Sequence, residues 1–490
     1  MSSDRQCDAR GYIWPLHQTI VPIRRSINKV REDVRRIRTP GSFARNSFHV
    51  LSGNALAMAS QLILTPLIAR IYGPEAYGLY ALYMALSMNL AAMSDLGYAT
   101  AYVLPRDEER FLHLVRFNIG LALVLGLLAT GLSFMPGLVY SVFPDWQVLG
   151  GWLHWVGPAS ALYALSVFFT QWLTRAKEFK RSAFTGATID LSMRLFNVGF
   201  GWLAKAPSYG LMLGDLLIRA LIIPVYLWSL GPHGLGRLFA WRPWRELRSV
   251  LLEYKRYPLL VFPERWVSLL GIQLPTFLLA ADLSMVGQYG LGASLMLIPL
   301  RLLGYSFSTV YLQKAAEIVH HAPDELRRLT HGLYNRLFWV GLGPFLLLTF
   351  FADEAFALLF GEEWRNAGVI SAFIGGYFFF RLLTDPMASL FNVKRREHVM
   401  LIFGMVMLGV RAAAMLATAA MGHGSEVVIL VYALLSWAGQ LVLSVVLLNT
   451  AGIAGFRVTL RSLGLVALFA FLLALVRFAI LGTWWPWFTN

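Results

Sequence analysis

The sequence predicts an all-α, polytopic membrane protein. Hydrophobic residues make up 57 % of the 490 residues and charged residues only 14 %, against about 25 % charged in soluble proteins. Apolar runs of about 20 residues, long enough to cross the hydrocarbon core of a bilayer as a helix, recur along nearly the whole chain. The sequence lacks the alternating segments of about 10 residues that are typical of outer-membrane barrels.

Thirteen apolar segments are expected to be spans. Twelve form two six-helix lobes, 47–230 and 258–452, joined by a basic cytoplasmic linker at 231–257. One further span and an external aromatic tail with Trp484, Trp485 and Trp487 occupy 453–490. The spans lie near 47–69, 76–104, 113–136, 149–174, 182–204, 207–230, 258–280, 284–312, 333–352, 366–393, 398–421, 426–452 and 462–482.

The distribution of lysine and arginine predicts the orientation. With the N-terminus in the cytoplasm, the cytoplasmic segments hold 32 of the 42 basic residues, and the external segments hold only Arg70, Lys205 and Arg365. Cytoplasmic loops of membrane proteins collect basic residues. The count therefore favours a cytoplasmic N-terminus, and it explains the net charge of +15 without a nucleic-acid partner.

Residues 1–46 form a basic arm before the first span. Apolar residues recur at three- and four-residue spacing between 20 and 37, with arginine and lysine between them. This pattern is typical of an amphipathic helix on the cytoplasmic leaflet; an unstructured positive anchor is the alternative. The single cysteine, Cys7, excludes an intramolecular disulfide and a cysteine metal cluster.

An internal repeat relates the two lobes. A shift of 212 residues sets 61–84 over 273–296 with nine identities in 24 positions, including Tyr77-Gly78-Leu79 over Tyr289-Gly290-Leu291. Six spans separate the copies, so both insert the same way up. The lobes are then related by a pseudo-two-fold axis along the membrane normal, an arrangement that suits alternating access.

Prolines fall at corresponding positions of the two lobes. Pro66 in the first span and Pro275 in the seventh each remove a backbone hydrogen bond and are expected to interrupt their helices, as is Pro299 in the eighth. Paired interruptions indicate a central binding site. The alternative is that prolines are common in membrane helices.

Several segments resemble a known family. Residues 47–86, Ser94–Gly97, 286–304 and the loop Leu358–Trp364 are similar to the polysaccharide-export and O-antigen flippases of the multidrug/oligosaccharidyl-lipid/polysaccharide exporter (MOP) superfamily. The resemblance covers about 46–452. It identifies the family rather than the cargo.

The resemblance implies a flippase of the bacterial inner membrane. The implied substrate is an undecaprenyl-pyrophosphate-linked oligosaccharide, moved from the cytoplasmic to the outer leaflet for lipopolysaccharide or exopolysaccharide synthesis. Membrane lipids, a polysaccharide polymerase and chain-length proteins are the implied partners. No cofactor is expected, although a proton or sodium gradient could drive the cycle.

Three arginines within spans have an acidic residue four positions away. Residues at this spacing share one face of a helix. Each pair is either structural or part of the cavity that binds substrate. The pairs are Asp190–Arg194, Asp215–Arg219 and Arg381–Asp385.

Arg301 and Arg411 have no acidic residue within a turn, and Arg301 follows Pro299 by two residues. An arginine at the bilayer centre costs on the order of 3 kcal/mol, so a group outside its own helix must balance the charge. Guanidinium matches phosphate with two parallel hydrogen bonds. We expect a substrate pyrophosphate at both, with a carboxylate on another helix as the alternative.

Three further charges lie within or near spans. Arg477 stands near the end of the last span and is expected to extend to the interface. Asp95 has no basic residue within four positions, and Glu264 adjoins Arg265. Either acid could take up a proton or sodium ion; a structural salt bridge is the alternative.

Other functions within the superfamily remain open, namely a peptidoglycan lipid II flippase or a small-molecule antiporter. A membrane glycosyltransferase or polymerase is the alternative from another class. The sequence has no Gly-rich phosphate loop, metal-spaced cluster or nucleophile elbow. Transport is therefore favoured over catalysis.

Overall fold

A computed structural model gives the fold and describes residues 43–205, 207–239 and 243–486. Every regular element within these residues is a helix. Eight helical segments there are long and apolar enough to cross a membrane. The prediction of an all-α membrane protein is therefore confirmed. The predicted N-terminal amphipathic helix, Cys7 and Trp487 lie outside the described residues.

The first half of the chain, up to the predicted linker, folds into long helices with short connections. Local capping helps to fix their ends: the Asp107 carboxylate accepts a hydrogen bond from the Glu109 amide at the start of α4, at 3.2 Å. The elements are α2 (Phe43–Asp95), α3 (Tyr98–Ala101), α4 (Glu108–Ser133), α5 (Pro136–Val142), η1 (Pro144–Trp152), α6 (Leu153–Arg175), α7 (Phe179–Leu203) and α8 (Gly210–Phe239).

The linker contains α9 (Trp244–Glu253), and the second half follows it. Asp282 caps α11 by accepting from the Met285 amide at 3.0 Å. The elements are η2 (Tyr257–Val261), α10 (Phe262–Leu278), α11 (Leu283–Pro299), η3 (Leu300–Gly304), α12 (Tyr305–Ile318), α13 (Pro323–Phe360), η4 (Glu362–Trp364), α14 (Arg365–Thr384), η5 (Asp385–Met387), α15 (Ser389–Val393), α16 (Glu397–Ala420), α17 (Ser425–Thr450) and α18 (Gly455–Leu481).

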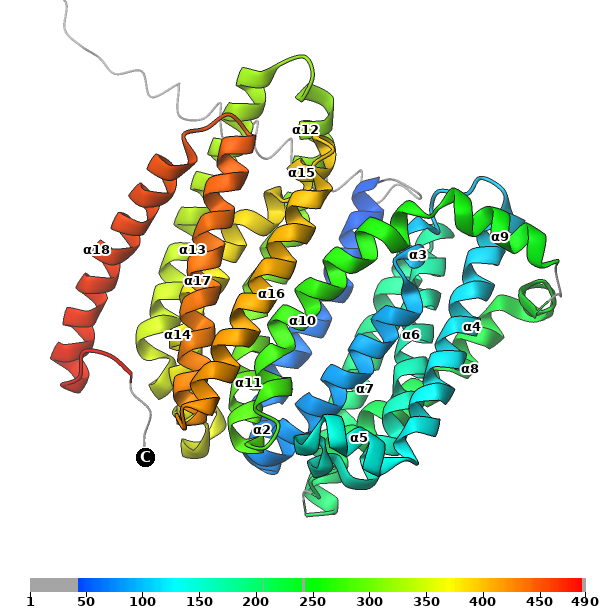
Figure 1. The fold of residues 1–490 in the computed structure, drawn as a ribbon, viewed down its shortest axis with the longest axis horizontal. Coiled ribbons are helices and arrows are strands. Elements are labelled where there is room, and N and C mark those ends of the chain that lie inside the picture. The colour runs from blue at the N-terminus through cyan, green and yellow to red at the C-terminus, as the bar shows by residue number, and fades with distance from the viewer. Residues whose placement is uncertain (1–42, 206, 240–242, 487–490) are drawn as a thin grey trace, which may run out of the picture.

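The two halves of the chain occupy opposite sides of the molecule in Figure 1. Helices α4, α6 and α8 lie on one side, and α13, α14 and α17 lie on the other. Between them, α2 packs against both α10 and α11. The lobe boundaries and the pseudo-two-fold axis stay predictions.

The predicted helix breaks are only partly correct. Pro66 and Pro275 lie inside α2 and α10, which continue past them. The break in α2 falls instead at Gly73, with φ 71° and ψ 173°. Gly73 precedes Pro74, and proline disfavours a helical conformation in the residue before it, whereas glycine adopts positive φ without strain.

Pro299 does mark a change in the helix, as predicted. It ends α11, and the next five residues, Leu300–Gly304, form the π-helical turn η3 before α12 begins. Such turns widen the backbone locally and occur frequently at functional sites. Arg301 lies within this turn.

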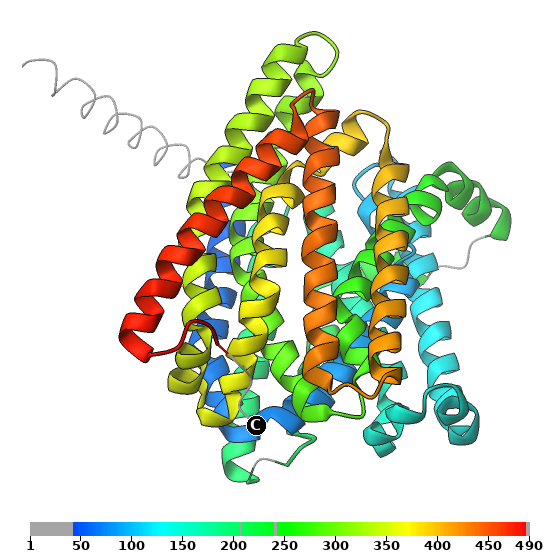
Figure 2. The ribbon, with the colours of Figure 1, turned by 60° about the vertical axis from the view of Figure 1, so that its left-hand side comes forward.

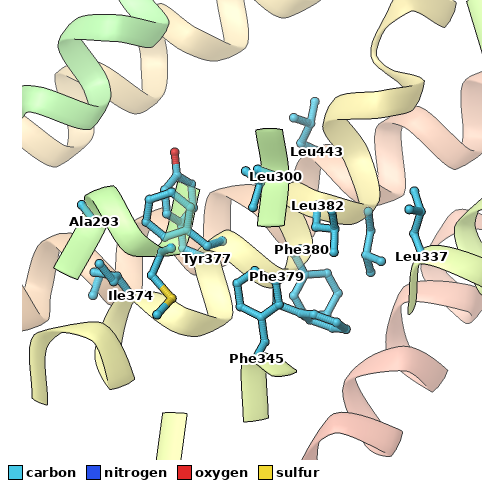
Figure 3. Packing of buried hydrophobic residues seen from close by; sticks show 14 of the residues in the cluster. Ala293, Leu300, Leu337, Phe345, Ile374, Tyr377, Phe379, Phe380, Leu382 and Leu443 are labelled. Carbon is cyan, nitrogen blue, oxygen red and sulfur yellow. The ribbon is translucent and has the colours of Figure 1, made fainter. Parts of the chain in front are cut away.

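The second half contains the largest apolar core. Helix α14 is apolar on nearly all sides and is buried along most of its length between α13, α17 and α11. Phe345 on α13 lies beside Phe379 and Phe380 on α14 (Figure 3), with the rings of Phe345 and Phe379 5.8 Å apart. This packing gives α14 a rigid position in the second half.

All thirteen predicted spans are helical. The eight long, apolar segments cover nine of them, because α2 includes the first two. The other four correspond to α6, α7, α10 and α11. Helices α10 and α11 contain only 17 residues each, because the π-helical segments η2 and η3 adjoin them.

The last helix, α18, packs on α13 and α17 and slopes away from α17 (Figures 1 and 2). The expectation that Arg477 extends to the interface is wrong. Its side chain is 4 % exposed and forms a two-pronged ion pair with Asp353 of α13, at 2.6 and 2.8 Å. Trp485 packs on Phe350 at 4.9 Å, whereas Trp484 is exposed.

Candidate functional site

A polar cavity of about 150 Å³ lies in the first half, between α2, α7 and α8, and reaches α11 of the second half. We call it the first-half cavity. Hydroxyl, amide and aromatic groups dominate its lining, and Arg194 is the one charged residue among them. The lining residues are Gln61, Thr65, Ile68, Tyr77, Tyr80, Met193, Arg194, Asn197, Leu211 and Ser294.

Each guanidinium nitrogen of Arg194 has a hydrogen-bond partner at this cavity. Its Nε and Nη2 donate to the two carboxylate oxygens of Asp190, at 2.9 and 3.4 Å, and its Nη1 donates to the Thr65 hydroxyl at 2.9 Å. The Ser60 hydroxyl donates to the same carboxylate at 2.9 Å. The predicted pair is thus present, and it links α2 to α7.

Other polar atoms of the cavity have spare hydrogen-bonding capacity. Asn197 is 3 % exposed, and its Oδ1 has no hydrogen-bond partner among the described residues. The Tyr80 hydroxyl has only the Met193 sulfur, at 4.0 Å. Buried polar atoms normally have partners, so the side chains that line the cavity keep hydrogen-bonding capacity that the fold does not use.

The second predicted pair of the first half, Asp215–Arg219, lies outside the cavity lining. Arg219 Nε donates to Asp215 at 2.8 Å, and its guanidinium lies 4.5 Å from the centroid of the Tyr163 ring. Asp215 is 1 % exposed. A pair that is buried and covered in this way holds α8 against α6.

The third predicted pair lies in the second half. Arg381 Nε donates to Asp385 at 2.8 Å, and its Nη1 donates to the Tyr377 hydroxyl at 3.3 Å. The pair joins the end of α14 to η5. Helix α12 packs on η5, and the π-helical turn η3 packs on α14, so Arg301 and Arg381 lie on neighbouring elements.

Arg411 is buried without a carboxylate partner in the part of the chain that the structure describes. It is 6 % exposed, and its Nε has no hydrogen-bond partner there. The guanidinium lies 5.4 and 5.7 Å from the ring centroids of Tyr377 and Tyr432. The two π-faces attract the cation in place of a carboxylate, which neither alternative from the sequence included.

Arg301 differs from Arg411 in its exposure. Its side chain is exposed, and it has neither an ion pair nor a hydrogen bond with any described residue. The π-helical turn holds it just after Pro299. Among the described span arginines of the predictions, Arg301 is the one that is both exposed and without a hydrogen bond to a described residue, so a ligand can reach its donors.

The two acidic candidates both lie near Arg265. Asp95 and Glu264 both interact electrostatically with Arg265, and Glu264 also interacts with Arg381 and Asp385. The Asp95 carboxylate also accepts from the Ala99 amide at 2.7 Å, which caps α3.

Arg265 connects the halves at this end of the interface, because its Nη1 donates to the Thr100 hydroxyl of the first half at 2.6 Å. Near the same end, Gly97 of the turn between α2 and α3 approaches Tyr257 and Phe262 closely.

The halves also meet at the opposite end, near Gly73. A Cβ at Gly78 of α2 would lie 1.8 Å from the Leu283 carbonyl oxygen, and one at Gly287 of α11 would lie 1.9 Å from the Pro74 carbonyl oxygen. Trp364 Nε1 donates to the Ala69 carbonyl at 3.2 Å. The glycines allow α2 and α11 to cross in direct backbone contact.

Within residues 43–205, 207–239 and 243–486, no group of three or more His, Cys, Asp or Glu side chains is arranged to hold a metal ion.

A family model described as polysaccharide biosynthesis protein matches residues 67–369, more than half of the chain. The chain belongs to this family. The family predicted from the sequence motifs is therefore confirmed. The match includes Arg301 and the first-half cavity apart from Gln61 and Thr65, and it ends before Arg411. A search of curated proteins gave no match to this chain.

Solved transporters share the fold of this polysaccharide biosynthesis protein. The structure titled "Lipid II flippase MurJ, inward closed conformation" has a TM-score of 0.62 at 16 % identity, over 86 % of this chain and 91 % of that chain. An inward-facing multidrug resistance MATE family transporter of the MOP superfamily has a TM-score of 0.62 at 13 % identity, over 85 % and 99 %. A MOP superfamily transporter from Pyrococcus furiosus has a TM-score of 0.53 at 13 % identity, over 86 % and 95 %. These likenesses show a MOP-type fold.

The sequence pattern predicted Arg194 as a candidate site residue, but it did not predict the neutral residues that line the same cavity. Tyr80, Asn197 and Ser294 carry no charge and come from three different helices, so no spacing along the chain brings them together. Tyr77 had a signal, because it belongs to the repeated Tyr-Gly-Leu motif.

Proposed function

We propose that this protein flips a polyprenyl-pyrophosphate-linked glycan from the cytoplasmic to the outer leaflet of the bacterial inner membrane by alternating access. The observation that carries the proposal is Arg301, an exposed arginine without a partner among the described residues, at a π-helical turn between two apolar helices. An uncompensated cation within a membrane span costs free energy, and Arg301 lies in the predicted eighth span. A pyrophosphate would offset that cost through charged hydrogen bonds.

Arg381 and Arg411 extend the cationic region around Arg301. Arg381 lies on α14, which the Arg301 turn contacts, and Arg411 shares the Tyr377 ring with Arg381. In the described conformation Arg411 is enclosed, so it would reach a phosphate only after α10 and α14 move apart. Arg301 is therefore the first contact in the proposed cycle.

The membership of the polysaccharide biosynthesis family supports a glycan as the cargo. The MOP-type fold supports movement of the cargo by rocking of the two halves about their interface. In the proposed cycle, protonation of Asp95 or Glu264, or sodium binding there, would weaken the contacts of Arg265 and open the Gly97 end. A polymerase and chain-length proteins would take up the glycan outside.

The test uses the full-length protein in liposomes with a labelled polyprenyl-pyrophosphate glycan in one leaflet. The label should appear in the other leaflet, and the mass of the lipid should stay unchanged. Lipid II and a cationic drug serve as comparison substrates in the same assay. Glycan elongation, release of polyprenyl pyrophosphate, or movement of only the drug would overturn the proposal.

A further inference from the structure

We infer that the first-half cavity binds one uncharged sugar ring, namely the ring attached directly to the pyrophosphate of the lipid-linked glycan. The inference rests on the proposed function and assigns the cavity a separate part of the same substrate. It starts from the charge of the site. Arg194 is the one charged residue in the lining, and Asp190 and Thr65 occupy its Nε, Nη1 and Nη2.

This ion pair makes the cavity unsuitable for a phosphate. A phosphate binds best to a guanidinium with two free parallel donors. In Arg194 the Nε–Nη2 pair faces the Asp190 carboxylate, and Nη1 of the other edge donates to Thr65. An anion would also be repelled by that carboxylate, whose Oδ2 already accepts from Ser60 and Arg194. The cavity is therefore a site for a neutral, polar ligand.

The remaining lining fits a sugar. The side-chain amides of Asn197 and Gln61 can form hydrogen bonds, and the hydroxyls of Tyr77 and Tyr80 can donate. The tyrosine rings and Leu211 supply apolar surface for the C–H faces of the ring. Mixed apolar walls with a few placed polar groups are typical of small-molecule sites.

The size of the cavity limits the ligand. At about 150 Å³ the cavity has about half the volume of the smallest drug-sized sites, which begin at about 300 Å³. One ring is accommodated, and a disaccharide is not. The rest of the glycan must therefore extend away from the cavity.

The position of the cavity relative to Arg301 fits the connection between sugar and pyrophosphate. Ser294 of the lining and Arg301 are seven residues apart, along α11 and the first residues of η3. Seven residues at about 1.5 Å each put the two residues about 10 Å apart along the helix axis. A ligand with its ring beside Ser294 can place its phosphates at Arg301.

The experiment measures equilibrium binding by the full-length protein in nanodiscs. The probes are polyprenyl pyrophosphate and the same lipid with one N-acetylhexosamine. Wild type should prefer the sugar-bearing lipid. Tyr77→Phe and Asn197→Ser should each weaken binding of that lipid about fivefold, the equivalent of one neutral hydrogen bond, and leave binding of the bare lipid unchanged. Tyr83→Phe is the matched control, because Tyr83 lies on the same helix outside the lining and its buried hydroxyl has no partner among the described residues.

The outcomes separate the two claims. If wild type binds both lipids with equal affinity, or both cavity variants keep the preference, the sugar site is overturned and the proposed function stands. Equal weakening of both lipids in the variants also overturns it, since the cavity would then contact the pyrophosphate. If wild type binds neither lipid, the proposed function fails, and the sugar site fails with it.

Discussion

The two halves balance the arginines of their membrane helices in different ways. In the first half, Arg194 and Arg219 each pair with a carboxylate one turn earlier on the same helix. In the second half Arg381 pairs with Asp385, which follows it by one turn, but Arg301 and Arg411 have no carboxylate partner among the described residues. Only the second half therefore retains uncompensated positive charge. We expect it to bind the anionic part of a substrate, and the first half to bind the neutral part.

The largest expected effect tests whether a buried arginine with a carboxylate is structural. Asp353→Leu leaves Arg477 buried without its partner, which should lower the free energy of unfolding by about 3–5 kcal/mol. Chemical unfolding in detergent measures this change. Flipping per folded molecule should stay normal, because the pair joins α13 to α18 away from the candidate site.

The double variant Asp353→Leu with Arg477→Leu is the control. Removal of both charges should recover most of the lost stability, because apolar residues often replace a buried ion pair without loss. A double variant as unstable as the single one would show that the pair itself, rather than the isolated charge, determines the stability of the α18 contact.

The next effect concerns the exposed cation. Arg301→Ala should weaken binding of bare polyprenyl pyrophosphate by about tenfold to a hundredfold, since a hydrogen bond to a charged group contributes about 1.5–3 kcal/mol. Arg301→Lys should recover part of the affinity, because lysine keeps the charge but loses the planar pair of donors. Unchanged affinity in the alanine variant would remove the assignment of the pyrophosphate to the second half.

Much of the fold followed from patterns within single helices. Each predicted span is helical, and the three ion pairs at four-residue spacing are present, because both depend on local periodicity. Contacts between distant helices were not predictable in this way. Arg477 pairs with Asp353 across 124 residues. The break in α2 falls at Gly73, because a glycine before Pro74 adopts positive φ without strain, whereas Thr65 before Pro66 stays helical.

The enclosed cation gives a smaller effect. Arg411→Met keeps an unbranched side chain of similar reach and removes the charge between Tyr377 and Tyr432. Loss of the cation–π contacts should lower the free energy of unfolding by about 1 kcal/mol. Because Arg411 is 6 % exposed, affinity for polyprenyl pyrophosphate should fall less than in Arg301→Ala. A larger fall would show that Arg411, not Arg301, makes the main contact.

The smallest expected effect comes from a substitution that gives the first half an arginine without a carboxylate partner, as in the second half. Asp190→Asn removes the negative charge that neutralises Arg194 and retains a side chain that can still accept a hydrogen bond from it. The first-half cavity then carries a net positive charge. Affinity for bare polyprenyl pyrophosphate should rise by about threefold, which corresponds to a fraction of one charged hydrogen bond, and the preference for the sugar-bearing lipid should fall. Asp215→Asn is the matched control, because it frees Arg219 by the same substitution outside the cavity lining and should leave the preference unchanged. If Asp190→Asn alters neither affinity, the charge of the cavity does not influence the ligand, and the proposed division between a neutral first half and a cationic second half is wrong.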